Sequence, residues 1–201
     1  YETFIMSRAM YNFSYDPMPH MSQTAIKQIL MNTQDNWQDY YKNETIQFLD
    51  KAIYEFEKEN NTLEKKKNYL PKLKNYILDK YTDSDGRRNA LSTINFFLGS
   101  ELGAMFSGLI EKRLDYQKLI KSKQKFMVVI TFTDAEKDFA GGASSIFLND
   151  LLLTFESNKS VAPKIYGDEA SSLSNSDIWH DALSRGRSAG LGTLLSYQSL
   201  H

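Results

Sequence analysis

The residues of this sequence that are best suited to chemistry follow two apolar runs near its C-terminal end. Asp168 and Glu169 close the run in "KIYGDE", and Gln198 closes the run in "GLGTLLSYQ". A carboxylate at a strand tip can hold the water shell of Mg²⁺, because this hard cation prefers oxygen ligands. A second carboxylate can orient or deprotonate an attacking water, and a nearby amide can contact a terminal phosphate. An acidic pair alone also ends many ordinary strands, so the nucleotide-site hypothesis depends on its combination with Gln198 and with "GRSAG".

These side chains need a parallel sheet to bring them together. After residue 125 the sequence alternates between apolar runs typical of strands and segments typical of helices. In chain order we expect a strand at 126–132 that is buried on both faces, a helix at 141–157 after a Gly-Gly break, a strand at 164–169, a helix at 175–187 and a strand at 190–198. This alternation is typical of an α/β fold with right-handed crossovers. Ligands of such folds bind beyond the carboxyl ends of the strands, so Asp168, Glu169 and Gln198 are expected at one edge.

The first part of the chain has a different pattern. Residues 22–120 show apolar residues at helical spacing and no strand signal. We expect Asn43 to cap one of these helices and Pro71 to kink or split another. Residues 1–19, rich in aromatic residues and methionine, are expected to form an irregular lead-in. The predicted fold class is therefore α/β with a large all-α domain, divided near residues 121–125 into domains 1–123 and 124–201.

Composition excludes several classes of site and leaves one charged segment to explain. The 201 residues include no cysteine, so disulfides and thiolate metal sites are excluded, and three scattered histidines make a histidine-based metal site a poor hypothesis. No run of 18 apolar residues occurs, so we expect nothing here to span a membrane. The net charge is −1, but residues 62–125 hold 14 Lys and Arg against 7 Asp and Glu. This excess is typical of a solvated helix face, or it marks a surface for an acidic partner, either protein or nucleic acid.

The C-terminal segment resembles the ATPase domain of type IV secretion system coupling proteins, the TraG/TraD-like motors of conjugation and effector export. The resemblance rests on "YGDEASSL" as the Walker B strand, "ALSRGRSAGL" as a helix exit and "LLSYQS" as the glutamine-bearing strand. It covers about 75 residues, and the helical residues 1–120 lie where that family inserts its all-alpha domain. The resemblance implies a helical bundle followed by the strands and helices of a RecA-like parallel sheet.

The resemblance also implies roles for individual residues. Asp168 would hold Mg²⁺ through water, Glu169 would be the catalytic carboxylate, and Gln198 would contact the phosphate end of ATP. Arg187 matches the position of an arginine finger, which acts on the nucleotide of a neighbouring subunit, and a guanidinium fork suits that task. The alternative for Arg187 is a cation that interacts with the C-terminal end of its own helix. Arg185 would be a supporting charge.

One motif of the family is missing, and it limits what the chain can do alone. No G-x-x-x-x-G-K-[ST] phosphate loop occurs in these 201 residues. Because the sequence also starts at Tyr1, we interpret it as a fragment whose parent is a P-loop ATPase, and we expect the fragment to be inactive by itself.

The resemblance implies partners for the whole protein as well. We expect a homo-hexamer at the cytoplasmic face of the bacterial inner membrane, with its anchor outside this chain, that exports a relaxase–DNA complex or a protein effector. The sequence leaves two other functions open. The first is a non-enzymatic helical module that recruits an acidic regulator, chaperone or cargo protein. The second is a septal DNA translocase, against which the large helical insertion argues.

Overall fold

The structure is a computed structural model that describes residues 2–7, 10–31, 38–99, 103–123, 125–131, 137–157, 164–167, 184 and 192–195. Within these residues the chain forms two compact units, and each is described by itself. The helical unit comprises the described residues of Thr3–Leu114 and Val128–Thr131. The α/β unit comprises the described residues of Tyr1–Glu2, Asp115–Met127 and Phe132–His201.

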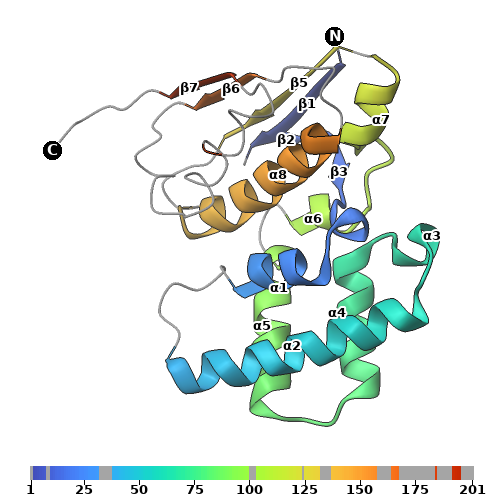
Figure 1. The fold of residues 1–201 in the computed structure, drawn as a ribbon, viewed down its shortest axis with the longest axis vertical. Helices are drawn as coiled ribbons and strands as arrows, with labels where there is room; N and C mark the ends of the chain where they lie inside the picture. Colours follow the sequence, from blue (N-terminus) through green and yellow to red (C-terminus); the bar gives the residue numbers. More distant parts are fainter. Residues whose placement is uncertain are drawn as a thin grey trace, which may run out of the picture. The chain divides into compact units, whose positions relative to one another are not determined.

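Helices make up most of the helical unit. They are η1 (Met18–His20), α1 (Gln23–Met31), α2 (Asp39–Glu59), α3 (Leu63–Lys66), α4 (Tyr69–Lys80), α5 (Asp85–Leu98) and α6 (Gly103–Phe106). The helix α2 crosses α4 and α5, which lie beside each other (Figure 1). Apolar residues at helical spacing face inward, and Leu49, Ile53 and Ile94 are at most 1% exposed. At the crossing of α2 and α5, a side chain on Gly86 would come within 3.1 Å of Cβ of Phe48, so the glycine allows the close approach.

Two details of the helix predictions are wrong. The helix α2 begins at Asp39 after Gln38, so Asn43 lies inside the first turns and does not cap it. Pro71 neither kinks nor splits a helix, because it is the third residue of α4, where its missing N–H leaves no intrahelical bond unmade. The break falls earlier, at Asn68, whose backbone is left-handed with φ 57°.

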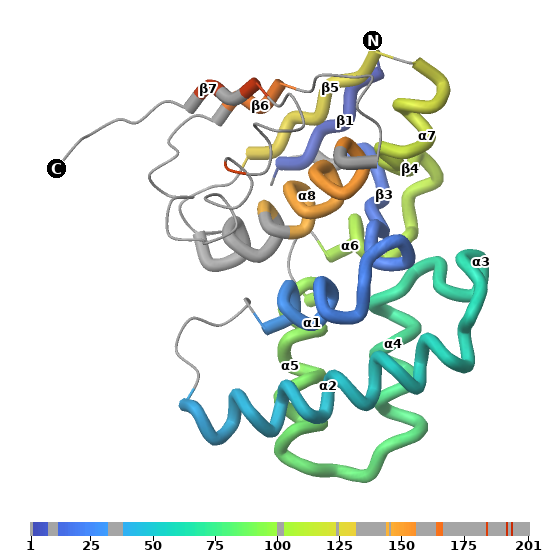
Figure 2. Tube along the Cα trace, viewed as in Figure 1, coloured from blue at the N-terminus to red at the C-terminus, as the bar shows by residue number. Residues whose placement is uncertain are grey.

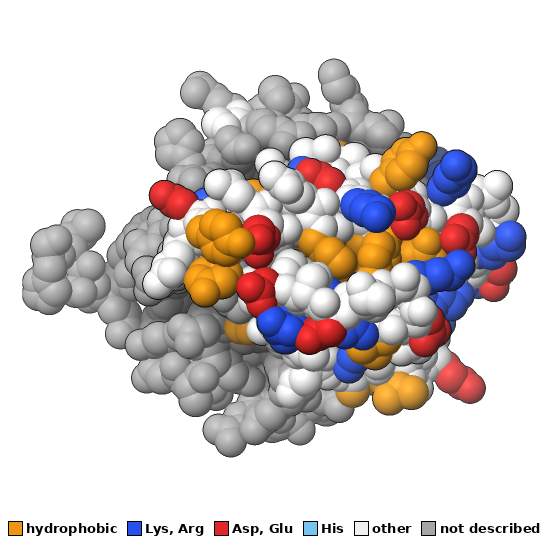
Figure 3. Space-filling view, turned by 90° about the horizontal axis from the view of Figure 1, so that it is seen from below, with side chains coloured by type: hydrophobic (Ala, Val, Ile, Leu, Met, Phe, Trp, Pro, Cys, Tyr) orange, Lys and Arg blue, Asp and Glu red, His pale blue; other side chains and the backbone are white. Residues whose placement is uncertain are grey.

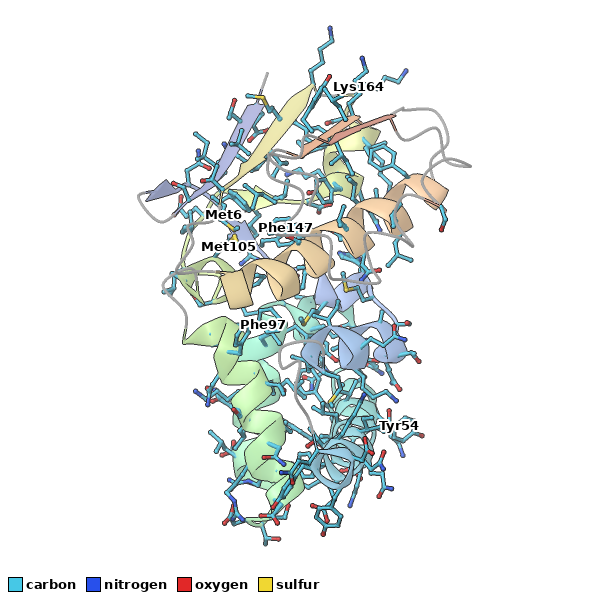
Figure 4. The ribbon with its side chains drawn as sticks, turned by 90° about the vertical axis from the view of Figure 1, so that its left-hand side faces the viewer. Met6, Tyr54, Phe97, Met105, Phe147 and Lys164 are labelled. Atoms are coloured by element: carbon cyan, nitrogen blue, oxygen red, sulfur yellow. The ribbon has the colours of Figure 1, made fainter. Side chains whose placement is uncertain are left out.

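The described residues of the lead-in 1–19 form short strands, contrary to the prediction of an irregular segment. The lead-in contains β1 (Glu2–Ser7), β2 (Met10–Tyr11) and β3 (Ser14–Tyr15). Its aromatic residues belong to the core of the helical unit, since ring contacts run from Phe4 through Phe13 and Tyr15 to Phe106. Phe106 in turn contacts Phe97 of α5, with ring centroids 5.6 Å apart. The fully buried Met6, Phe97 and Met105 are labelled in Figure 4.

The strand β5 (Phe126–Ile130) confirms a strand at the start of the second half, in a sheet of order β2-β1-β5. The β1–β2 pair is antiparallel. Backbone hydrogen bonds from Glu2 N to Lys125 O and from Thr131 N to Met6 O join β1 to β5, and this order of partners makes the pair parallel. The expected burial on both faces is wrong, because Met127 is 52% exposed and the other residues of the strand are half-buried. One face of β5 is therefore not covered by the described residues.

Further elements belong to the α/β unit, and Figure 2 follows their path along the chain. They are α7 (Tyr116–Lys121), α8 (Lys137–Ser157), β6 (Lys164–Gly167) and β7 (Gly192–Leu195). The predicted strands at 164–169 and 190–198 are thus confirmed over their described residues. The Gly-Gly break is not, because α8 continues through residues 141 and 142. Of the helix expected at 175–187 the structure describes only Ser184, which is helical.

Candidate functional site

The strands β6 and β7 form the frame of the predicted nucleotide site. They pair in parallel, and their register sets Lys164 opposite Gly192 and Gly167 opposite Leu195. The two strands therefore end level with each other at one edge. In the sequence Asp168 follows Gly167 directly, and Gln198 comes three residues after Leu195. The predicted nucleotide site requires this arrangement, because Asp168, Glu169 and Gln198 can share one edge of the sheet only if the two strands end at the same level.

The four predicted site residues themselves, Asp168, Glu169, Arg187 and Gln198, lie outside the described residues. Their roles therefore stay predictions. The strand side chains that are described show an uncovered face instead: Tyr166 is 70% exposed and Leu194 is 63% exposed. Lys164 is also exposed, and its side chain points away from the ribbon in Figure 4.

A second notable feature is the place where the chain enters and leaves the helices of the helical unit. The strand β3 precedes these helices and pairs in parallel with β4 (Arg113–Leu114), a short strand inside the range that was expected to be all-helical. Ser14 fastens the pair with its side chain, since Oγ donates to Ile110 O at 2.7 Å and accepts from Ile110 N at 2.8 Å. Ser14 N also donates to Lys112 O at 2.7 Å. We call residues 14–16 and 110–114 the neck of the helical unit.

Asp16 links the neck to the start of α4. Its carboxylate accepts a hydrogen bond from Asn68 N at 2.6 Å and another from Tyr69 N at 3.3 Å. Asn68 precedes α4 but makes no capping bond with its own side chain, so a residue 52 positions away caps this helix. Burial raises the pKa of Asp16, although the two backbone N–H groups, Arg113 and His20 oppose the shift. The two hydrogen bonds of Asp16 therefore join the end of β3 to the start of α4, in the middle of the helical unit.

The helices α2 and α4 are held together by a set of tyrosines that we call the tyrosine ladder: Tyr69, Tyr76 and Tyr81. Each hydroxyl donates to a glutamate of α2: Tyr69 to Glu57 at 3.2 Å, Tyr76 to Glu59 at 3.1 Å and Tyr81 to Glu55 at 2.6 Å. Desolvation, together with the glutamate neighbours, raises the pKa of Tyr76 to about 12 and raises the pKa values of the other two tyrosines as well. Because each glutamate accepts a hydrogen bond from a tyrosine hydroxyl, the ladder joins the two helices.

Exposed cations gather where α3 meets α4. Figure 3 shows Lys and Arg side chains concentrated on the side where Figure 1 places α3. Lys65, Lys67 and Lys72 come from this junction, and Arg113 comes from β4. The Lys67 ammonium lies 2.6 Å from Glu64, and with Lys72 and Arg113 farther out it lowers the pKa of that carboxylate. The predicted basic segment 62–125 is therefore divided, since Lys118, Lys121 and Lys123 belong to the α/β unit.

The described part of the chain offers little other chemistry. Its Asp, Glu and His residues form no group of three that could hold a metal ion. Among the described helices, none is both long enough and apolar enough to span a membrane. An open groove of about 420 Å³ between α4 and α6 is lined by Pro71, Leu98 and Ala104, and Lys74 supplies its positive charge. Such a lining can bind an apolar group but contains no acid–base pair.

Comparison with known proteins gives a fold for the whole chain. No protein-family model matches the sequence, and no curated protein sequence matches it either. Among solved structures, the plasmid coupling protein TrwB with the GTP analogue GDPNP matches with a TM-score of 0.59 and 14% identity over 98% of this chain. TrwB with ADP and Mg²⁺ matches over 98% with a TM-score of 0.57 and 13% identity, and TrwB with the ATP analogue ADPNP matches over 96% with a TM-score of 0.59 and 14% identity. The chain has the fold of a conjugative coupling protein.

This match confirms the predicted fold class, α/β with a large all-α part, and the resemblance to coupling proteins on which it drew. The chain spans about half of each matched structure, with 52% covered in all three.

Sequence reasoning missed the residues that organise the neck. Ser14 and Asp16 act on partners far away in the sequence, at Ile110 and Asn68, so no local periodicity points to them. The available signal was composition: polar Ser14 and Asp16 stand among three aromatic residues and a methionine in "YNFSYDPMPH", which is too apolar for a solvated lead-in. Buried polar groups need partners, and this rule identifies such residues once burial is expected.

Proposed function

We propose that the chain is part of the coupling ATPase of a type IV secretion system, which recruits DNA or protein substrates and couples ATP hydrolysis to their export. The observation that carries the proposal is the coupling-protein fold over 98% of the chain, found in a sequence whose "YGDEASSL" and "LLSYQS" coincide with the level ends of β6 and β7. TrwB, which has this fold, was solved with ADP and Mg²⁺ and with ATP analogues.

In this proposal the residues after β6 and β7 form the working end of a nucleotide site. Asp168 holds Mg²⁺ through water, and Glu169 orients and deprotonates the attacking water. Gln198 contacts the terminal phosphate. Carboxylate and amide oxygens are the donors that Mg²⁺ and its water shell require, so the residues suit the ion. ATP and Mg²⁺ would supply the phosphoryl-transfer chemistry, and the phosphate loop must come from residues outside these 201.

Two further parts complete the proposal. Arg187 reaches the nucleotide of a neighbouring subunit in a homo-hexamer at the cytoplasmic face of the bacterial inner membrane. The helical unit recruits the cargo, a relaxase–DNA complex or a protein effector, or an acidic regulator. The recruiting part is supported by the exposed cations of Lys65, Lys67 and Lys72.

The test is a Glu169→Gln variant of the protein as it occurs in the cell, with all the residues that flank this chain. Glutamine keeps the size of the side chain and removes its basicity, so the variant should retain nucleotide and lose hydrolysis. Nucleotide affinity and phosphate release are measured on the same preparation. The matched control is Glu111→Gln, which makes the same chemical change at an exposed position of the helical unit and should leave turnover at the native rate. Native turnover in the Glu169→Gln variant contradicts the catalytic assignment.

A further inference from the structure

The exposed cations at the α3–α4 junction come together through contacts that the fold itself specifies. Lys65, Lys67 and Lys72 are all exposed, and Lys72 Nζ donates to Lys65 O at 2.7 Å, which draws the first turn of α4 against α3. Arg113 joins them from a distant part of the chain. It pairs with Ser14 across the neck, and Asp16 binds Asn68 N at 2.6 Å, so β4 is fastened beside this junction.

Internal ion pairs within the described residues neutralise only part of this charge. Lys66 points inward to Glu57 at 3.0 Å and is only 16% exposed, so it belongs to the bundle. Two described carboxylates act on the exposed cations: Glu64, which pairs with Lys67 at 2.6 Å and is itself 78% exposed, and the half-buried Asp16, which interacts with Arg113. The surface therefore presents an excess of positive charge. A leucine lies in the same segment, and Leu63 is 55% exposed.

We propose that Leu63, Lys65, Lys67, Lys72 and Arg113, called the junction surface, form a docking site for an acidic segment of a partner protein that also carries an apolar side chain. The positive charge selects an anionic partner, which could be nucleic acid or an acidic protein segment. The exposed Leu63 favours the protein segment. A phosphate backbone gains nothing from an exposed leucine, whereas an acidic amphipathic segment can cover it while its carboxylates meet the lysines. Single-stranded nucleic acid would also require exposed rings for base stacking, and among the described residues the exposed rings lie elsewhere, on α2 (Tyr40, Tyr41 and Tyr54) and on β6 (Tyr166).

The docking site has a consequence for the neck. A segment that spans the junction surface contacts two parts of the helical unit at once. It contacts β4, where the chain leaves the helices, through Arg113, and it contacts the helices through the lysines of the α3–α4 junction. Asp16 already joins these elements from the inside. The bound segment therefore reinforces the link from the outside. The inference deepens the recruiting part of the proposed function and rests on that part alone, because it requires neither nucleotide nor hydrolysis.

The test measures binding of the full 201-residue chain to a labelled peptide of Glu-Leu-Glu-Glu repeats by fluorescence anisotropy at low salt. The double variant Lys65→Glu, Lys72→Glu should bind about tenfold or more weakly, since two attractive contacts become repulsive. The matched control is Lys42→Glu, Lys58→Glu on α2, which changes the net charge equally at exposed positions and should bind within about twofold of the native chain. If both double variants weaken binding equally, the peptide responds to the net charge of the chain and not to the junction surface, and the proposal is overturned.

Two further probes separate the nature of the partner. Leu63→Ser should weaken binding of the Glu-Leu peptide and leave binding of a polyglutamate peptide of equal charge unchanged. Oligothymidylate of equal charge should bind less tightly than the Glu-Leu peptide, and tighter binding that the Lys65, Lys72 pair abolishes would assign the surface to nucleic acid instead.

Thermal unfolding checks that each variant is folded. If charge reversal lowers the melting temperature, Lys65→Gln with Lys72→Gln replaces it, and undiminished peptide binding by that pair refutes the docking site. The nucleotide affinity of the protein is unaffected by any of these outcomes, so failure here and failure of the ATPase proposal are distinguishable.

Discussion

Replacing Asp16 by alanine tests whether the neck holds the helical unit together. In the native structure the two carboxylate oxygens accept from Asn68 N at 2.6 Å and Tyr69 N at 3.3 Å. The variant leaves both N–H groups at the start of α4 without this acceptor. Loss of a helix cap costs about 1 kcal/mol, and a hydrogen bond to a charged group contributes roughly 1.5–3 kcal/mol. Because Asp16 is half-buried and the second bond is long, we expect a loss of about 2 kcal/mol in the free energy of unfolding at neutral pH.

The pH dependence of this loss has a definite sign. Burial raises the pKa of Asp16 above its ordinary value of 3.8. For an acid with a raised pKa in the folded state, the stabilising contribution is complete below the unfolded pKa and is lost as pH rises through the folded pKa. The alanine variant lacks this titration, so its deficit should be larger near about pH 4 than near about pH 7. Urea unfolding followed by circular dichroism at both pH values measures the difference.

Asp16→Asn supplies the matched control. Asparagine keeps one acceptor oxygen for one of the two N–H groups and carries no charge, so its deficit at neutral pH should be smaller than that of alanine. An alanine deficit that shrinks toward acidic pH would mean that the folded state favours the ionised carboxylate, contrary to the burial argument. An alanine variant as stable as the native chain would refute the capping role altogether.

Three other perturbations address separate features. Gly108→Ala should destabilise the chain by about 1–3 kcal/mol in urea unfolding, because Gly108 has φ +74° and an added Cβ would lie 2.1 Å from Asn68 Oδ1; a neutral result would contradict the close approach. In alkaline titration the tyrosine ladder should ionise only as the helical unit unfolds, since its raised pKa values make a contribution to stability that is present below about pH 10 and is lost as pH rises through the folded values. The chain has 12 tyrosines, so the ladder's share is the difference in tyrosinate absorbance between the native chain and a variant with phenylalanine at all three ladder positions; a difference that rises well before circular dichroism changes would count against this. Arg187→Ala should leave nucleotide binding intact and reduce turnover of the assembled ring by roughly a thousandfold, whereas a helix-end cation would leave turnover nearly normal.

The helices of residues 22–120 and the strands β6 and β7 could be predicted because their signals are local. Apolar spacing such as that of Leu49, Ile53 and Phe56 repeats within one helix, and the same side chains are buried in the structure. The helix boundaries could not be predicted as well, because they depend on single backbone positions. Asn68 separates α3 from α4 with a left-handed conformation, and nothing in the lysine-rich segment before it identifies that residue.

The lead-in was mispredicted because its order comes from partners far along the chain. The strand β3 is two residues long, too short for an alternating pattern, and its partner β4 begins at Arg113. The candidate nucleotide site likewise has one part that could be predicted from local sequence and one part that could not. Its strand frame follows from local apolar runs, whereas the roles of Asp168, Glu169 and Gln198 rest on the resemblance to coupling proteins and lie outside what the structure describes.

The neck gives a physical reason why a chain with this fold can carry so large a helical insertion. Residues between β3 and β4 form a loop of about one hundred residues, and the entropic cost of closing a loop rises only slowly with its length. A few strong contacts at the point of closure therefore suffice, and Ser14 and Asp16 supply them on the entry side. On the exit side Lys112 Nζ donates to Thr3 O at 2.6 Å and lies 4.4 Å from the ring centre of Phe4, which fastens the returning chain to β1. Because both ends of the insertion are fixed at one place, helices between them can vary in sequence without disturbing the strands, and a partner that binds the junction surface contacts both the insertion and its point of closure.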